Sequence, residues 1–445
     1  MKKTSCKIIG LFLAVLMALH VITPIHVTAD NESLQGYDFI AYSFGSEFAS
    51  NYFRTLDLLD SFYESLPRNR MGSTMYPDSF GGIYINCYGE LVVLVVEGLR
   101  ESAIQGFADN LVEDGVLVRN VEFAYNVLRD TFDMLGVIVP NSPNNIAASN
   151  VDGISLDVIN NQLLISLAVY TEEKIMLFRE MVHDAPYLAF HLSPGIASYS
   201  YNQHLYNSAY ETYADWYVLD EGVVELDNVR SISPVRPGNT LFVRGNTGLR
   251  EAGSVGYRAT AVINGREQVG FVTAAHLGLD PNLFGRILRV GDRFYNSAGQ
   301  HIGTVQLTQR HALDLAFFTL APGITSNTAT HMGNVLPRTI PPTTGSIVFL
   351  DGLHGRGRDG TIRTSWQGNT GSGWTFGFRT TYFSDHGDSG GIVYSWTNVS
   401  NNGVAGIHAA GWGYGHWADR GNALFTTVGD HIHDLWFFQH NLRLH

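Results

Sequence analysis

The sequence has 445 residues, of which 45% are hydrophobic and only 16% are charged, and its formal net charge is −13. This composition excludes a disordered polymer, and the length suffices for about two or three domains with buried cores. The sequence contains no basic cluster and no arginine run interleaved with aromatic residues. Nucleic-acid binding therefore finds no support.

The beginning of the chain has the pattern of an export signal. Lysines at the start are followed by an apolar stretch at 8–22 and by small residues ending at Ala29. This pattern predicts a secretory signal peptide at residues 1–29 and an extracellular protein. A transmembrane anchor is disfavoured because His20 and Pro24 shorten the apolar run.

Only two cysteines occur, Cys6 and Cys87. Cys6 would leave with the signal peptide, so the exported chain would keep one thiol and no internal disulfide, and its stability would come from packing. The apolar neighbours of Cys87 predict an unpaired, buried thiol rather than a reactive one.

Charge is divided unevenly along the chain. Residues 235–445, here called the back region, contain 16 arginines, no lysine and 12 acidic residues, which leaves +4 for the back region and −17 for the remaining 234 residues. We call residues 30–234 the front region. The opposite charges predict electrostatic complementarity between the two, as between an inhibitor and its target. Alternatively, each charge only keeps its own region soluble.

The front region contains a repeat. The stretches beginning at Gly81 and at Asp152 each have the pattern of a strand, a turn, a second strand and an amphipathic helix, with turns at 88–89 and 160–161. Neither copy holds a cluster of metal-ligand residues or a phosphate-binding glycine loop. The repeat predicts an α+β helper domain of two hairpin-helix units rather than an active site.

The character of the sequence changes near residue 235, where prolines and a glycine at 231–240 mark a domain boundary. The following sequence alternates short apolar segments with glycine, asparagine and aspartate turns, which predicts a mainly β sandwich or barrel. A stretch at 428–442 has helical spacing and is expected to pack on the outside. The predicted strands lie at 241–245, 258–263, 269–275, 301–307, 313–320, 346–350, 391–395 and 403–411.

Three residues of the back region combine into a catalytic pattern. Ser389 lies in the small polar run "GDSGG", His276 ends the apolar strand "GFVTAAH", and Asp314 immediately precedes the apolar strand "LAFF". A serine is a weak nucleophile unless a base accepts its proton. A histidine does so when a buried carboxylate holds its other ring nitrogen and stabilises the imidazolium. The order His276, Asp314, Ser389 therefore predicts nucleophilic catalysis.

The segments "TAAH", "DLA" and "GDSGG" resemble the three signature segments of chymotrypsin-like serine proteases. The cysteine-poor sequence with "GFVTAAH" is similar to the bacterial branch of streptogrisins, alpha-lytic protease and glutamyl endopeptidases, and the front region is similar in layout to the pro-regions of that branch. The resemblance implies a serine endopeptidase made as a proenzyme. It implies two antiparallel six-stranded β-barrels in the back region, with the site between them, and an α+β pro-region at 30–234.

The glycines around the serine belong to this interpretation. The backbone N–H groups of Gly387 and Ser389 would bind the carbonyl oxygen that becomes negative, and glycine at 387 would let the backbone turn its N–H inward. The resemblance further implies that Asp388 is buried and paired with an arginine. Arg356 and Arg358 are both candidates for this partner.

Specificity is predicted from the segment at 406–413, which by resemblance forms one wall of the pocket for the residue before the cut, with His408 pointing inward and Gly411 lining the wall. Glutamyl endopeptidases have a similar "GIH", so an imidazole would bind the substrate carboxylate. His386 would be a second polar group at the rim. The alternatives are a histidine satisfied within the core and a pocket of apolar or mixed specificity.

The distribution of glutamate favours cleavage after glutamate. Of 16 glutamates only Glu251 and Glu267 lie beyond residue 235, so the back region is nearly free of its own cut sites. Glu221 and Glu225 lie just before the boundary, where self-processing would be useful.

We expect protein or peptide substrates, the front region as an intramolecular chaperone and inhibitor, a monomer, no membrane attachment after signal removal, and no cofactor. The run "HIHD" at 431–434 is interpreted as solvent-facing histidines rather than a metal site. A catalytically silent barrel that only binds remains the alternative from another functional class.

Overall fold

The computed structural model describes the chain from residue 36 to residue 444 with several gaps. The predicted signal peptide, the helix expected after the first hairpin, Glu221, Glu225 and the stretch at 428–441 lie outside the described residues. The structure describes residues 36–68, 74–98, 116–193, 234–245, 248–278, 286–309, 313–330, 332–353, 357–369, 374–384, 387–398, 401–411, 423–427 and 442–444. Within them, no helix has the length and apolar character needed to span a membrane.

The first part of the front region packs two helices, α2 (Tyr37–Phe44) and α3 (Ser46–Ser65), beside a sheet of three strands, β1 (Phe80–Ile85), β2 (Leu91–Val96) and β3 (Leu117–Val121). Helix α3 buries one face because its apolar residues recur every three or four positions. Strand β2, "LVVLVV", is buried on both faces.

The prediction of a buried thiol in this part was wrong. Cys87 is a free, exposed cysteine in the turn between β1 and β2. Gly89 has a φ of 77° there, a conformation suited to glycine. Burial was inferred from apolar neighbours that belong to the strands, whereas the thiol itself lies in the exposed turn.

The second part of the front region contains another hairpin. Its turn has Asn161 at a φ of 52°, which asparagine tolerates better than most residues. Helix α6 begins after Thr171, whose side chain accepts a hydrogen bond from the backbone N–H of Lys174 at 3.3 Å. The elements are α5 (Tyr125–Ile138), a 3₁₀ turn η2 (Ala148–Asn150), β4 (Val151–Asp157), β5 (Gln162–Leu167), α6 (Glu172–Met181) and β6 (Leu188–Leu192).

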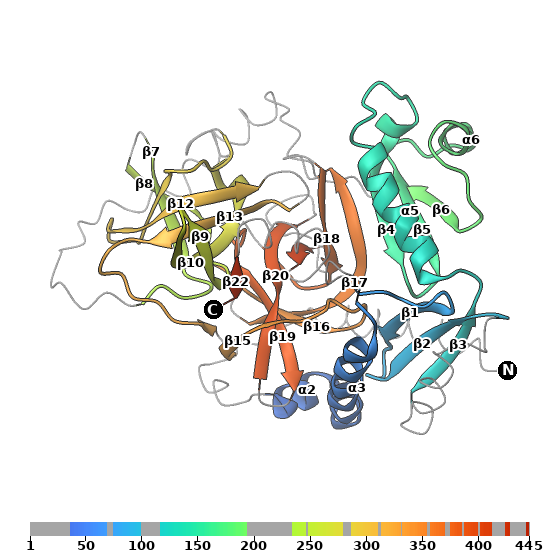
Figure 1. Cartoon of the computed structure of the whole chain (residues 1–445), viewed down its shortest axis with the longest axis horizontal. Helices are drawn as coiled ribbons and strands as arrows, with labels where there is room; N and C mark the ends of the chain where they lie inside the picture. Colours follow the sequence, from blue (N-terminus) through green and yellow to red (C-terminus); the bar gives the residue numbers. More distant parts are fainter. Residues whose placement is uncertain are drawn as a thin grey trace, which may run out of the picture.

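The back region is mainly β, as predicted. Its first half and the C-terminal strand β22 form an antiparallel sheet of eight strands in the order β22-β9-β10-β13-β12-β11-β7-β8. In Figure 1, β7, β8 and β12 of this sheet lie at the opposite side of the molecule from α5 and α6 of the front region. The sequence predicted barrels of six strands, whereas this sheet has eight. Its strands are β7 (Thr240–Gly245), β8 (Gly248–Ser254), β9 (Arg258–Ile263), β10 (Arg266–Ala274), β11 (Arg293–Tyr295), β12 (His301–Gln309), β13 (Leu315–Leu320) and β22 (Arg443–Leu444).

The second half of the back region belongs to a sheet of eleven strands that it shares with the front region. Six of these strands pair in a closed antiparallel ring, β20-β19-β16-β17-β18-β21 and back to β20. The strands of this half are β14 (Ala329–Thr330), β15 (Gly333–Thr339), β16 (Ile347–Asp351), β17 (Arg358–Asn369), β18 (Trp374–Thr380), β19 (Ile392–Asn398), β20 (Asn401–Gly411) and β21 (Ala423–Thr427).

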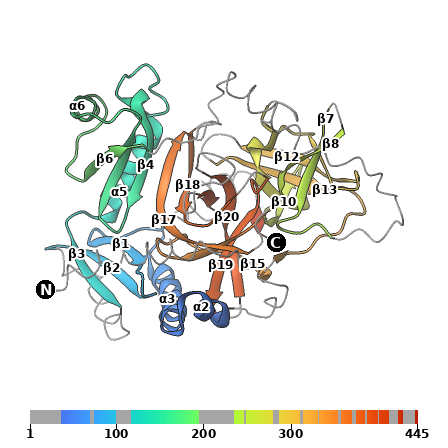
Figure 2. The same ribbon diagram turned by 180° about the vertical axis from the view of Figure 1, so that it is seen from behind.

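The front region contacts this second sheet through several elements, of which strand β4 and helix α3 make two of the contacts. Strand β4 pairs antiparallel with β17, so that β4, β5 and β6 extend the sheet of the back region, as seen from both sides in Figures 1 and 2. Helix α3 packs against β19, and the backbone N–H of Ile347 donates to the buried hydroxyl of Tyr52 at 2.9 Å. Front and back thus share two hydrophobic core clusters.

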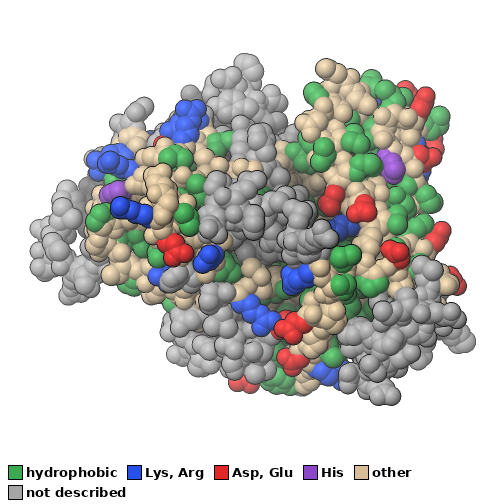
Figure 3. Space-filling view, viewed as in Figure 1, with side chains coloured by type: hydrophobic (Ala, Val, Ile, Leu, Met, Phe, Trp, Pro, Cys, Tyr) green, Lys and Arg blue, Asp and Glu red, His purple; other side chains and the backbone are tan. Residues whose placement is uncertain are grey.

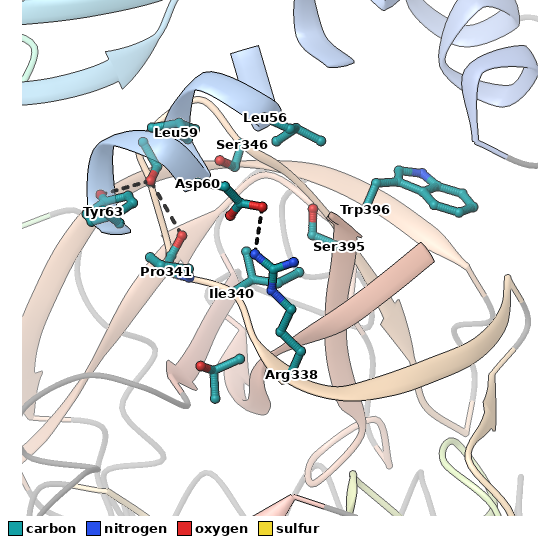
Figure 4. A pocket seen from close by; sticks show the side chains of 12 residues that line it. Leu56, Leu59, Asp60, Tyr63, Arg338, Ile340, Pro341, Ser346, Ser395 and Trp396 are labelled. Carbon is teal, nitrogen blue, oxygen red and sulfur yellow. Dashed lines mark hydrogen bonds and ion pairs between the residues drawn. The ribbon is translucent and has the colours of Figure 1, made fainter. Parts of the chain in front are cut away.

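A small pocket lies beneath α3 at this second contact (Figure 4). Asp60 of α3 points across it and pairs with Arg338 at 2.6 Å. Tyr63 of the same helix hydrogen-bonds to Thr343 at 3.2 Å. On the face in Figure 3, acidic side chains lie mainly over the front region and basic ones mainly over the back region. The pocket therefore lies in an interface with complementary charge.

Candidate active site

The register between two strands places His276 beside Asp314. His276 lies in the 3₁₀ turn η3 (Ala275–Gly278) directly after β10, and Asp314 directly precedes β13. The two strands are antiparallel neighbours in which Ala274 faces Leu315 (Figure 1). The end of one strand and the start of the other therefore meet at the same edge of the sheet.

The carboxylate of Asp314 binds both the ring and the backbone of His276. One oxygen, Oδ2, lies 2.5 Å from His276 Nδ1, and the other accepts the backbone N–H of His276 at 2.9 Å. The backbone of Asp314 has a φ of 48°, a left-handed conformation that aspartate adopts more readily than most residues. The contact fixes the ring so that Nδ1 faces the carboxylate and Nε2 is the nitrogen left for other chemistry.

The two side chains differ in exposure, and the pKa of His276 is shifted. The side chain of His276 is 22% exposed and that of Asp314 only 7%. Burial alone lowers the pKa of His276, but the charge of Asp314 and the hydrogen bond to it outweigh burial, so the pKa lies above its ordinary value of 6.5.

Ser389 lies in the loop between β18 and β19, and this loop contacts the first sheet. The backbone N–H of Ser254, at the end of β8, donates to the carbonyl of Ser389 at 2.8 Å. A Cβ placed on Gly253 would lie 2.6 Å from that same carbonyl oxygen and 2.5 Å from Cδ2 of Leu277. The serine loop and the segment that follows His276 therefore pack on the same residue, although they come from different sheets.

Two glycines near the serine have left-handed backbone conformations. Gly387 has a φ of 90° and Gly390 a φ of 84°, both in the left-handed region that favours glycine. Among the residues described by the structure, neither the N–H of Gly387 nor that of Ser389 donates to another group of the protein. A Cβ at Gly387 would lie 2.5 Å from Leu353 Cδ2, so the leucine side chain would have to move, and the φ of 90° would strain any other residue at this position.

Asp388 has Arg358 as an ionic partner. The aspartate is fully buried, and Nη1 of Arg358 lies 3.5 Å from its Oδ2. The guanidinium also lies 4.6 Å from the ring centroid of Phe383 and donates to the Phe383 carbonyl at 3.4 Å. Of the two arginines considered from the sequence, Arg358 makes the contact, and Arg356 lies outside the described residues.

His408 lies directly beside the serine loop. In strand β20 its carbonyl accepts the N–H of Gly390 and its N–H donates to the carbonyl of Gly391, each at 2.9 Å. The side chain is 2% exposed, and its Nδ1 lies 3.0 Å from the hydroxyl of Tyr382. Burial, together with the positive charges of His276 and Arg358, lowers the pKa of His408 to about 3. The imidazole is therefore neutral near neutral pH.

Tyr382 was not found from the sequence. It is a buried residue just after β18, and burial and the charge of Asp388 raise its pKa well above the ordinary value of 10.0. Its hydroxyl therefore keeps its proton. Gly411, the last residue of β20, pairs with Ala423, whereas His386 lies outside the described residues.

Within the described ranges, no group of three or more His, Cys, Asp or Glu residues is arranged to hold a metal ion.

Comparison with known proteins gives one family match and several structural similarities. Residues 126–193 match the model of a family described as a Pro-like C-terminal domain. A search of curated proteins found no match.

Three solved structures are similar to about half of the chain. A chymotrypsin from Cellulomonas bogoriensis has 23% identity and a TM-score of 0.35, with 48% of this chain and 99% of that chain covered. A glutamic acid-specific serine protease described as using a histidine triad in substrate binding has 19% identity and a TM-score of 0.36, with 47% and 100% covered. A homologue of alpha-lytic protease has 18% identity and a TM-score of 0.34, with 48% and 100% covered.

Proposed function

We propose that the chain is a secreted serine endopeptidase, made as a proenzyme, that hydrolyses peptide bonds with Ser389, His276 and Asp314. The observation that carries the proposal is the double contact of Asp314 with His276, next to a glycine-rich serine loop. A surface histidine has no need of a carboxylate that orients both its ring and its backbone. Such a contact is required when the histidine must hold one tautomer and then carry a charge.

In the proposed reaction, the oxygen of Ser389 attacks the peptide carbonyl while Nε2 of His276 takes the serine proton. Asp314 stabilises the imidazolium, which then gives its proton to the leaving amine, and an acyl-enzyme ester remains. In the second half of the reaction, His276 takes a proton from water, the water oxygen attacks the ester, and the proton passes to Ser389 as the acid product leaves. The N–H groups of Gly387 and Ser389 bind the oxyanion, and loss of one such donor typically raises the barrier by about 3 kcal/mol.

The proposed role of the front region is to act as a template for the folding of the back region and to inhibit its peptidase activity. The β4–β17 pairing, the α3 contact and the charge complementarity all support it. Gln367 of β17 is buried and its amide donates to the carbonyl of Phe132 in α5, which ties a helix of the front region onto the same strand. The match of residues 126–193 to a Pro-like domain agrees with this assignment.

Cleavage after glutamate is the proposed specificity, with His408 as the group that binds the carboxylate. When the Tyr382 hydroxyl donates to Nδ1, the proton of the neutral ring is on Nε2, and that N–H can donate to a substrate carboxylate. A neutral donor suffices because a hydrogen bond to a carboxylate is charge-assisted from the acceptor side.

Two measurements test the proposal. An organophosphonate probe should label Ser389 of the secreted protein, and Ser389→Ala should abolish both the label and peptide hydrolysis. N-terminal sequencing of the secreted protein, together with a peptide-library digest, should give a new terminus near residue 235 and cuts after glutamate. An unlabelled, inactive wild-type protein would support a silent binding module instead.

A further inference from the structure

Ser254 makes four hydrogen bonds, which connect its strand to the serine loop, to Leu353 and to Thr273. Its backbone N–H donates to the carbonyl of Ser389 at 2.8 Å, and its hydroxyl donates to the carbonyl of Gly387 at 2.6 Å. The same hydroxyl oxygen accepts the N–H of Leu353 at 2.8 Å, and the Ser254 carbonyl accepts the hydroxyl of Thr273 at 2.8 Å. The residue is completely buried, so water does not compete for these bonds.

We propose that Ser254 is a positioning residue that holds the anion-binding backbone of the serine loop in its productive orientation. This inference rests on the proposed function. The N–H of Ser389 belongs to the peptide between residues 388 and 389. Ser254 binds the carbonyl on each side of that peptide, one through its hydroxyl and one through its backbone N–H. Ser254 therefore fixes the peptides on both sides, and the carbonyl of the peptide itself, that of Asp388, accepts the N–H of Gly391 at 2.9 Å. With its neighbours fixed, the Ser389 N–H cannot rotate away without breaking this hydrogen bond.

The hydroxyl is the part of Ser254 that glycine or alanine could not replace. Gly387 has a φ of 90° and no side chain that would restrict its backbone, so other groups must fix its orientation. Leu353 covers the α-carbon of Gly387, and its N–H is bound to the same hydroxyl oxygen. The Ser254 hydroxyl thereby joins the residue that covers Gly387 to the carbonyl of Gly387 itself.

Ser254 also crosses between the two sheets. It ends β8 of the first sheet, whereas Leu353 and Ser389 lie in loops between strands of the second. Since His276 is anchored on the first sheet, the Ser254 bonds fix the serine loop relative to the sheet that carries the base. A geometry that must be held within about 0.5 Å needs supporting hydrogen bonds of this kind.

The test compares Ser254→Ala with Ser395→Ala in the full chain. Ser395 is a matched control because it is also a buried serine whose hydroxyl donates to a backbone carbonyl, that of Ile347, away from the serine loop. We expect Ser254→Ala to lower kcat about 10-fold with little change in KM, less than the roughly 10²–10³-fold cost of deleting an oxyanion donor. Ser395→Ala should keep the wild-type kcat.

A second readout separates positioning from general loss of structure. A peptide aldehyde forms a tetrahedral adduct that needs the anion site, whereas a substrate-like peptide does not, so Ser254→Ala should weaken aldehyde inhibition about as much as kcat. Ser254→Thr, which keeps the hydroxyl, should have the kcat and the aldehyde inhibition of the wild type. This variant serves as the test if the alanine variant fails to fold. If wild type and Ser254→Ala have equal kcat and equal affinity for the aldehyde, the positioning role of Ser254 is refuted.

These experiments distinguish a failure of the proposed function from a failure of the positioning role of Ser254. A wild-type protein that neither hydrolyses peptides nor reacts with an organophosphonate would overturn the serine peptidase proposal, and the role of Ser254 would fall with it. An active wild type with an unaffected Ser254→Ala variant would leave the peptidase intact and remove only the positioning role.

Discussion

Replacing His408 with alanine should reduce cleavage after glutamate and spare cleavage after leucine. The hydrogen bond at stake joins a buried imidazole N–H to a carboxylate and is worth roughly 1.5–3 kcal/mol. At about 1.4 kcal/mol per decade, kcat/KM for a glutamate peptide should fall about 10- to 100-fold. Cleavage after leucine should change little or improve, because the pocket loses a polar group and gains room.

The pH dependence follows from the lowered pKa of His408. A residue that is neutral near neutral pH does not titrate as the pH rises through 6.5, so the preference for glutamate over glutamine in kcat/KM should stay constant there. The rates for both peptides should fall together in acid as His276 takes up a proton, and the ratio cancels this common effect.

Peptides that differ only in the residue before the cut provide the assay for both parts. If the glutamate preference declines as the pH rises past about 6.5, His408 binds as a cation, and the neutral-donor mechanism is refuted. If wild type cuts glutamate and glutamine peptides equally at every pH, His408 is a structural residue and the glutamate specificity is refuted, while the role of Ser389 stands.

Three further outcomes are expected. Asp314→Asn should lower kcat about 10⁴-fold. It should also shift the acidic limb of the pH profile of kcat to lower pH, because the charge that raises the His276 pKa is lost. An acidic limb at the wild-type pH would contradict the proposed role of Asp314. Arg358→Leu should cost about 3 kcal/mol in denaturant unfolding, since it removes the guanidinium beside buried Asp388, whereas Arg443→Leu breaks an exposed pair and should cost less than about 1 kcal/mol. The back region expressed alone should gain activity slowly and the separately expressed front region should accelerate this; prompt, full activity without the front region would refute the helper role.

The strands that were predicted from sequence share one property, an alternating or continuous apolar pattern bounded by turn residues. All eight predicted segments overlap a strand of the back region. Strand β17 was missed because "RDGTIRTSWQGN" is largely polar and becomes a strand through its neighbours, which include β4 from the front region. Its partner lies about 200 residues earlier, and no local pattern encodes such a pairing.

Some residues of the candidate site could likewise be predicted from local sequence patterns, and others could not. His276, Asp314 and Ser389 were predicted because each lies in a short, distinctive segment, and the structure shows the first two in direct contact. Tyr382 and Ser254 were missed because neither lies in a motif. Their roles depend on hydrogen bonds to residues 26 and 133 positions further along the chain, and only the fold creates these contacts.

The two halves of the site depend on the fold in different ways. His276 and Asp314 lie 38 positions apart and are aligned by one antiparallel strand pair, a contact that closes a short loop. Ser389 and His408 depend on the ring of strands that includes β17, and β17 carries the pairing with β4. Strand β18 pairs along most of β17 and leads directly into the loop that holds Ser389. Under the proposed function, the pairing of β4 with β17 would therefore affect the part of the site that holds Ser389 and His408. His276 and Asp314 are instead aligned by a strand pair of the first sheet.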